Sequence, residues 1–77
     1  MVVDLYGDAR QLKRELKAQG FTDWAAKLED ILAGGSTGTE IVMGLRWLMG
    51  KLPTASLTED TRQLINRIQL ATDALLR

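Results

Sequence analysis

The sequence contains no cysteine and no histidine among its 77 residues. Without thiols the chain forms no disulfide, and without thiolate or imidazole ligands we expect no structural zinc site. The side chains that most often exchange a proton near neutral pH are also missing, so catalysis would depend on carboxylates alone. We therefore expect a protein that is not an enzyme and that has no metal site, no cofactor and no small-molecule substrate.

The sequence also lacks an excess of charge and a long hydrophobic run. Ten basic and ten acidic residues cancel, and the pI of about 6.2 argues against a domain dedicated to nucleic acid or anionic lipid. No apolar run approaches the roughly 18 residues that a membrane span requires, and the N-terminal segment lacks the basic-then-apolar order of a signal peptide. We expect no membrane partner and a cytoplasmic location.

The small size of the chain limits its stability. A domain of this length removes only about 60% of its unfolded surface from water on folding. Because disulfides and zinc are excluded, self-association is the remaining way to add stability. We expect one helical domain over residues 1–77 that forms a homo-oligomer, most simply a dimer, or binds another protein.

Apolar residues recur at helical spacing in four segments, which predict helices over residues 4–19, 23–33, 38–52 and 57–76. In the first of these, one buried face is formed by Leu5, Ala9, Leu12 and Leu16. The link around Gly20 is so short that the first two helices must pack as an antiparallel pair. The predicted fold class is all-α, a small antiparallel four-helix bundle that dimerises.

Several residues are candidates for helix ends. Gly20 is expected to take a left-handed conformation after the first helix, which Asp4 or Asp8 would cap at its start. Hydroxyl residues precede the other three helices, and two of them have a glutamate three residues later, the pattern of a capping box. The predicted caps are Thr22, Thr37 with Glu40, and Ser56 with Glu59.

The stretch AGGSTGTEI, residues 33–41, has the composition of a loop that could wrap phosphate. A Walker-type loop requires a lysine after its last glycine, but Thr39 occupies that place here and a predicted helix precedes the loop. We interpret the stretch as a helix end followed by a helix start, with Gly34 or Gly35 at positive φ. Weak anion binding at exposed helix amides is the alternative.

The helix predicted over residues 38–52 has apolar residues on two sides. Ile41, Leu45, Leu48 and Leu52 form one stripe, and Met43 and Trp47 form a second. Either the other three helices wrap this helix completely, or the second stripe contacts another chain. We predict an interface in which Gly44 permits the close approach of another backbone, formed by Met43, Gly44, Trp47, Trp24 and Tyr6.

The first predicted helix carries a basic stripe at i, i+3, i+4 and i+7 spacing, formed by Arg10, Lys13, Arg14 and Lys17. Such a stripe could lie along phosphates, or it could be an ordinary solvated face with acidic residues nearby. A helix-turn-helix reader of DNA is disfavoured because the helix over 38–52 offers Met, Trp, Leu and Gly where base contacts need polar side chains. We therefore consider nucleic acid an unlikely partner.

The segment GSTGTEIVMGLRWLM, preceded by the WAAKLEDIL helix, resembles a set of short uncharacterised bacterial all-helical proteins. The shared features are a helix, a Gly-Ser-Thr-rich turn and an Arg-Trp helix, within residues 22–52. The resemblance implies a bacterial source and a helical fold, and no activity is attached to that set. By analogy with other small bacterial chains, it also suggests an immunity-type or antitoxin-type partner.

These observations favour a small cytoplasmic protein-protein interaction or assembly module without catalysis. The first alternative is a regulator that binds nucleic acid through the basic stripe. The second is the immunity-type or antitoxin-type partner.

Overall fold

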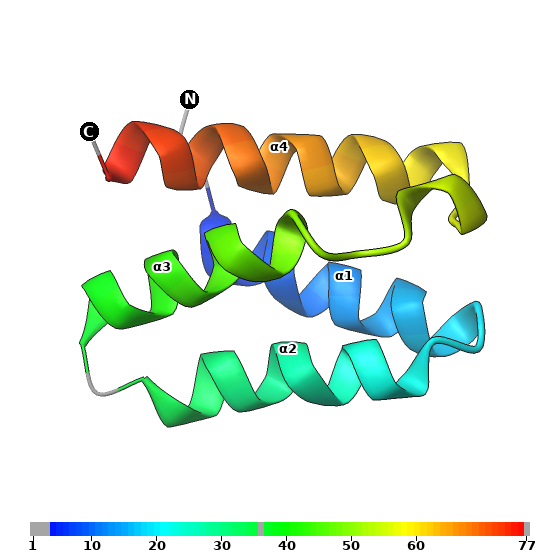
Figure 1. The fold of residues 1–77 in the computed structure, drawn as a ribbon, viewed down its shortest axis with the longest axis horizontal. Helices are drawn as coiled ribbons and strands as arrows, with labels where there is room; N and C mark the ends of the chain where they lie inside the picture. The colour runs from blue at the N-terminus through cyan, green and yellow to red at the C-terminus, as the bar shows by residue number, and fades with distance from the viewer. Residues whose placement is uncertain (1–3, 36, 77) are drawn as a thin grey trace.

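The computed structural model describes residues 4–35 and 37–76, so that residues 1–3, 36 and 77 of the predicted domain lie outside the described residues. The described residues form four α helices and one 3-10 turn, in the order α1 (Leu5–Ala18), α2 (Thr22–Gly34), α3 (Gly38–Met49), η1 (Thr54–Ser56) and α4 (Glu59–Leu75). Each predicted helix is present (Figure 1). The largest differences are that α3 ends at Met49, not at residue 52, and that α4 begins at Glu59, not at residue 57.

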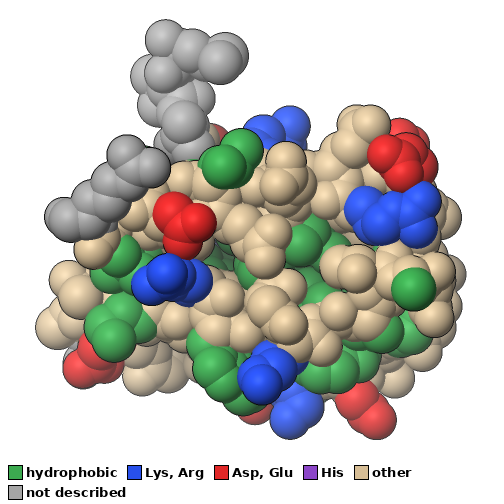
Figure 2. Space-filling model, turned by 45° about the horizontal axis from the view of Figure 1, so that its top comes forward, with side chains coloured by type: hydrophobic (Ala, Val, Ile, Leu, Met, Phe, Trp, Pro, Cys, Tyr) green, Lys and Arg blue, Asp and Glu red, His purple; other side chains and the backbone are tan. Residues whose placement is uncertain are grey.

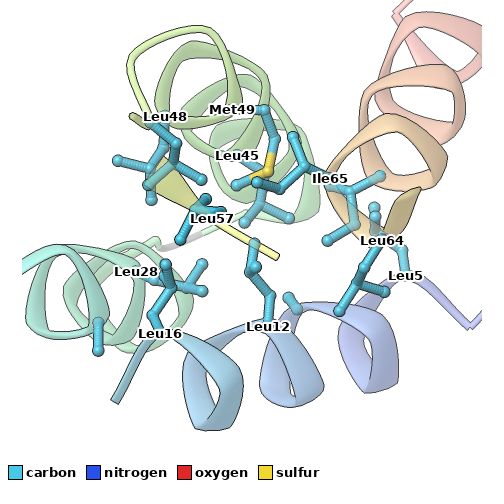
Figure 3. Close-up of a cluster of buried hydrophobic side chains, with 14 of the residues drawn as sticks. Leu5, Leu12, Leu16, Leu28, Leu45, Leu48, Met49, Leu57, Leu64 and Ile65 are labelled. Atoms are coloured by element: carbon cyan, nitrogen blue, oxygen red, sulfur yellow. The ribbon is translucent and has the colours of Figure 1, made fainter. Parts of the chain in front are cut away.

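The four helices enclose a common core. α1 and α3 each pack against both α2 and α4, which gives a closed ring of neighbours. Figure 3 shows leucine and isoleucine side chains from all four helices pointing into the centre of this ring. Full burial of such a side chain contributes about 1.5 to 3 kcal/mol each. The side chains with no exposed surface include Leu12, Leu16, Leu28, Leu45, Leu48 and Ile68.

The predictions for α1 are confirmed. Its four expected core residues are all buried, and the Asp4 carboxylate accepts a hydrogen bond from the Gly7 amide at 2.8 Å, which caps the helix. At the other end Gly20 has a φ of 87°. The Phe21 amide donates to the Leu16 carbonyl at 2.8 Å and the Gly20 amide donates to the Lys17 carbonyl at 3.1 Å. These two bonds form a Schellman motif, which ends α1 and turns the chain into α2.

The prediction that Thr22 caps α2 is wrong. Phe21 occupies the cap position without a side-chain hydrogen bond, and the Ala25 amide donates to the Phe21 carbonyl at 3.0 Å. Because Phe21 also closes the Schellman motif, α2 begins directly after it and Thr22 lies in the first turn. The capping role of Thr37 is confirmed, since its hydroxyl accepts from the Glu40 amide at 3.2 Å.

The predicted capping box of Ser56 and Glu59 is also wrong. Ser56 lies in η1, where its amide donates to the Pro53 carbonyl at 2.9 Å. Ser56 therefore belongs to the 3-10 turn that follows Pro53. The next hydroxyl residue, Thr58, caps α4 by accepting from the Thr61 amide at 3.3 Å. The Glu59 carboxylate binds the Arg62 guanidinium at 2.7 Å, and this hydrogen bond, with the positive charge, lowers the pKa of Glu59.

The glycines between α2 and α3 do not have the predicted backbone conformation. Gly20 alone has a positive φ in residues 4–35 and 37–76, whereas Gly35 is extended, with φ −73° and ψ 127°. A Cβ atom on Gly35 would collide with the side chain of Ile41. The turn therefore needs a small residue at position 35 because Ile41 packs against its backbone.

Candidate functional site

The outward side of α3 is the main apolar feature of the surface. Met43 is 57% exposed and Trp47 is 56% exposed, although Leu45 and Leu48 on the opposite side of the same helix have no exposed surface. The two exposed side chains are four residues apart and therefore lie one turn apart on one side of the helix. The alternative in which the other helices wrap Trp47 is wrong for this chain.

Residues of α4 extend this apolar surface across the seam between α3 and α4. One hollow is lined by Met43, Arg46, Trp47 and Leu76, and a second by Arg46, Asn66, Gln69, Leu70 and Asp73. Arg46 lines both hollows, so they adjoin each other. We call Met43, Arg46, Trp47, Leu70, Asp73 and Leu76 the α3–α4 surface. Figure 2, which brings α4 toward the viewer, shows hydrophobic side chains exposed among charged ones on this side of the molecule.

An ion pair crosses the seam within the α3–α4 surface. The Arg46 Nε lies 2.9 Å from the Asp73 Oδ1, and the two side chains are 60% and 48% exposed. Pairs this exposed contribute only about 0 to 1 kcal/mol to folding. Both charges therefore remain accessible to a partner, and their loss should not unfold the chain.

Tyr6 lies in a third hollow, at the end of the bundle. It is 41% exposed and shares this hollow with Thr39, Leu75 and Leu76. Because Leu76 also lines the hollow that contains Met43 and Trp47, the Tyr6 end continues the α3–α4 surface. The structure thus places three of the five predicted interface residues in adjoining hollows.

The other two predicted interface residues lie elsewhere. Trp24 on α2 is partly buried and packs against the core. Gly44 faces α2, where an added Cβ would lie 2.9 Å from the Cγ2 atom of Ile31. The close approach that Gly44 permits is therefore to a side chain of the same chain, and the prediction that it admits another backbone is wrong.

The predicted basic stripe is partly neutralised by α2. Lys13 forms an ion pair with Glu29 at 2.7 Å, while Arg10, Arg14 and Lys17 are exposed. The hydrogen bond from Lys13, followed by the charges of Lys13, Lys17 and Arg10, lowers the pKa of Glu29. A negative charge therefore lies beside the stripe and opposes the binding of phosphate.

Four members of the α3–α4 surface, Arg46, Leu70, Asp73 and Leu76, were not among the predicted interface residues. Leu70 is 63% exposed, and its position as an isolated apolar residue on the polar side of α4 was the signal that could have identified it. Asp73 and Leu76 gave no comparable signal, because their role depends on how α4 packs against α3. Leu75, the last residue of α4, is also 63% exposed.

The described parts of the chain contain neither a metal-binding cluster nor a membrane-spanning helix. Within them, no group of three or more acidic side chains is arranged to hold a metal ion. None of the described helices is both long enough and apolar enough to cross a bilayer.

Neither the scan against models of known protein families nor the searches of curated proteins and of solved structures found a match for this chain. The resemblance to short bacterial proteins therefore stays a prediction.

Proposed function

We propose that the protein is a small interaction or assembly module, without catalysis, that binds another protein chain through the α3–α4 surface. The observation that carries the proposal is the exposure of Met43 and Trp47, one turn apart and each more than half exposed. Met and Trp are enriched where proteins meet, and a contiguous apolar patch on a small domain marks an interaction site.

We also propose that the four helices form an antiparallel bundle and that the chain forms a dimer. The antiparallel order is supported by the short link at Gly20 and by the alternating directions of the helices in Figure 1. Dimerisation is supported by the small size of the chain, which has neither disulfide nor zinc to stabilise it. We propose a bacterial, cytoplasmic setting from the resemblance to short bacterial proteins.

Binding of nucleic acid through the basic stripe has less support, because Lys13 is already bound to Glu29. The two functions differ in their response to ionic strength. Binding through phosphate contacts weakens steeply as salt is added, whereas binding through the α3–α4 surface, which buries apolar side chains and one pair of charges, should weaken much less.

The experiment compares the two tryptophans. Trp47→Glu places a charge on the exposed side of α3, so the variant should fold and lose association, measured as the mass in light scattering and as capture by immobilised protein. Trp24→Glu is the matched control, since this side chain packs against the core and its replacement should reduce stability. A captured protein counts only if its purified form binds the wild type and not Trp47→Glu. If all associations survive Trp47→Glu, the proposed function is wrong.

A further inference from the structure

The charges on the α3–α4 surface form a self-complementary pattern. The α3 side carries a positive charge at Arg46 and the α4 side carries a negative charge at Asp73, and both are about half exposed. A partner that complements this surface must place a negative charge over α3 and a positive charge over α4. A second copy of the chain does so when its α4 lies over α3 and its α3 lies over α4.

We propose that the occupant of the α3–α4 surface is a second copy of this chain, with Arg46 of each copy facing Asp73 of the other. The inference rests on the proposed function and specifies its partner. The two exposed charges then lie within the contact, where they fix its register and exclude other partners.

The level of these residues along the helices supports this arrangement. Arg46 and Asp73 lie at the same height along the bundle, because they already pair across the seam at 2.9 Å. Rotation about a two-fold axis parallel to the seam does not change the height of a residue along the bundle. It therefore brings Arg46 opposite Asp73 of the second copy without any shift of the helices along their axes. Met43 and Leu76 line one hollow, and the same axis places Met43 over Leu76 of the second copy.

The exposed apolar residues of the α3–α4 surface supply most of the apolar area that a dimer interface needs. If a large side chain has a full area of roughly 200 Å², Met43 at 57%, Trp47 at 56% and Leu70 at 63% present on the order of 350 Å² per copy. A standard interface buries about 800 Å² per partner, of which roughly 57 to 65% is apolar. The polar residues of the same surface supply the remainder.

The decisive experiment uses two charge reversals, Arg46→Asp and Asp73→Arg, with the mass of the particle measured by light scattering. We expect the wild type to have twice the mass of one chain. Each variant alone should have the mass of one chain, because residues 46 and 73 of facing copies would then carry like charges at both of their contacts. An equimolar mixture should recover the doubled mass. In the mixed pair, the carboxylate introduced at position 46 of one variant meets the guanidinium introduced at position 73 of the other, and the unchanged Asp73 and Arg46 also meet.

This mixture separates a contact between chains from the ion pair within one chain. In both variants the internal pair becomes a like-charge pair, and mixing cannot repair it. A matched control is an ion pair that joins two other helices, Lys13 with Glu29 on α1 and α2. Lys13→Glu and Glu29→Lys should each keep the doubled mass of the wild type, and circular dichroism should show that all variants remain helical.

Trp47→Lys is an independent variant that leaves Arg46 and Asp73 unchanged. The proposal expects it to have the mass of one chain, and a retained dimer would overturn the proposal. The proposal is also overturned if the charge-reversed variants remain dimers or fail to combine on mixing. A wild type that stays at the mass of one chain at millimolar concentration overturns the second copy as occupant. The dimer in the proposed function would then be wrong as well, and its interaction module would survive only if a different purified protein binds the wild type and not Trp47→Glu.

Discussion

Thr61 of α4 donates its hydroxyl proton to the Glu15 Oε1 of α1 at 2.7 Å, and its side chain has no exposed surface. The same hydroxyl oxygen accepts from the Gln19 Nε2 at 2.7 Å. It also lies 2.9 Å from the Thr58 hydroxyl, which must be the donor because the single proton of Thr61 goes to Glu15. The side-chain Oε1 of Gln19 in turn accepts from the Thr58 backbone amide at 3.1 Å. These four residues connect the end of α1 to the start of α4.

This network should contribute measurably to folding. Thr61→Val keeps the shape of the side chain but leaves Gln19 and Glu15 without their buried partner, so we expect a loss of about 1 to 3 kcal/mol in the free energy of unfolding. Urea denaturation measures the loss. Thr72→Val is the control, since Thr72 is equally buried but its hydroxyl donates only to the Gln69 carbonyl of its own helix, at 2.9 Å. Equal losses in the two variants would mean that the network does not join the helices.

The start of α4 gives a second prediction. Thr58→Ala removes the hydroxyl that accepts from the Thr61 amide, so it should cost about 0.5 to 2 kcal/mol and lower the Tm by several degrees. Ser56→Ala should change stability by less than about 0.5 kcal/mol, because Ser56 lies in η1 and does not cap the helix. A larger loss of stability in Ser56→Ala would show that Ser56 caps α4, as the sequence predicted.

Ser56 and Thr58 show which features of the fold the sequence alone does not predict. The buried face of α1 and the end at Gly20 were predicted correctly because both depend on residues close together in the chain. Ser56 and Thr58 both have a suitable hydroxyl, and spacing to Glu59 favoured the wrong one. The choice depends on the 3-10 turn after Pro53, whose geometry no local pattern specifies.

The α3–α4 surface shows the same division. The exposed stripe of Met43 and Trp47 was predictable, because the periodicity of one helix determines which residues lie opposite its buried side. The pairing of Arg46 with Asp73, and the contact of Gly44 with Ile31, join residues from different helices. Such contacts depend on how the helices pack against one another, and this packing cannot be predicted from the periodicity of a single sequence.

Gly44 provides a third prediction. Gly44→Ala gains about 1 kcal/mol of helix propensity, but the new Cβ would lie 2.9 Å from the Ile31 Cγ2, and overpacking costs about 1 to 3 kcal/mol. Because β-branched side chains are stiff in helices, Ile31 yields little and we expect a net loss. Gly34→Ala should be neutral or stabilising, because its Cβ would lie more than 4 Å from the described side chains of residues that are not its chain neighbours. Guanidinium denaturation of both variants measures the change in the free energy of unfolding. A stabilising Gly44→Ala would show that Ile31 moves aside.

The fourth prediction concerns acid. Glu29 is 53% exposed, and the hydrogen bond from Lys13 lowers its pKa below the ordinary value of 4.5. The unfolded chain therefore takes up the proton first as the pH falls. The stability from this pair is complete above pH 4.5 and is lost as the pH falls through the lower pKa of the folded state. Stability should decline with acid in that window.

Glu29→Gln has no proton to take up at this position, so its urea midpoint should decline less between neutral pH and the acid window than that of the wild type. Lys13→Met should flatten the curve in the same way, because it removes the hydrogen bond and the charge that lower the pKa of Glu29. Added salt should reduce the effect of the charge, since the pair is exposed. If Glu29→Gln declines as steeply as the wild type, other carboxylates cause the acid response and the Lys13 pair does not contribute to it.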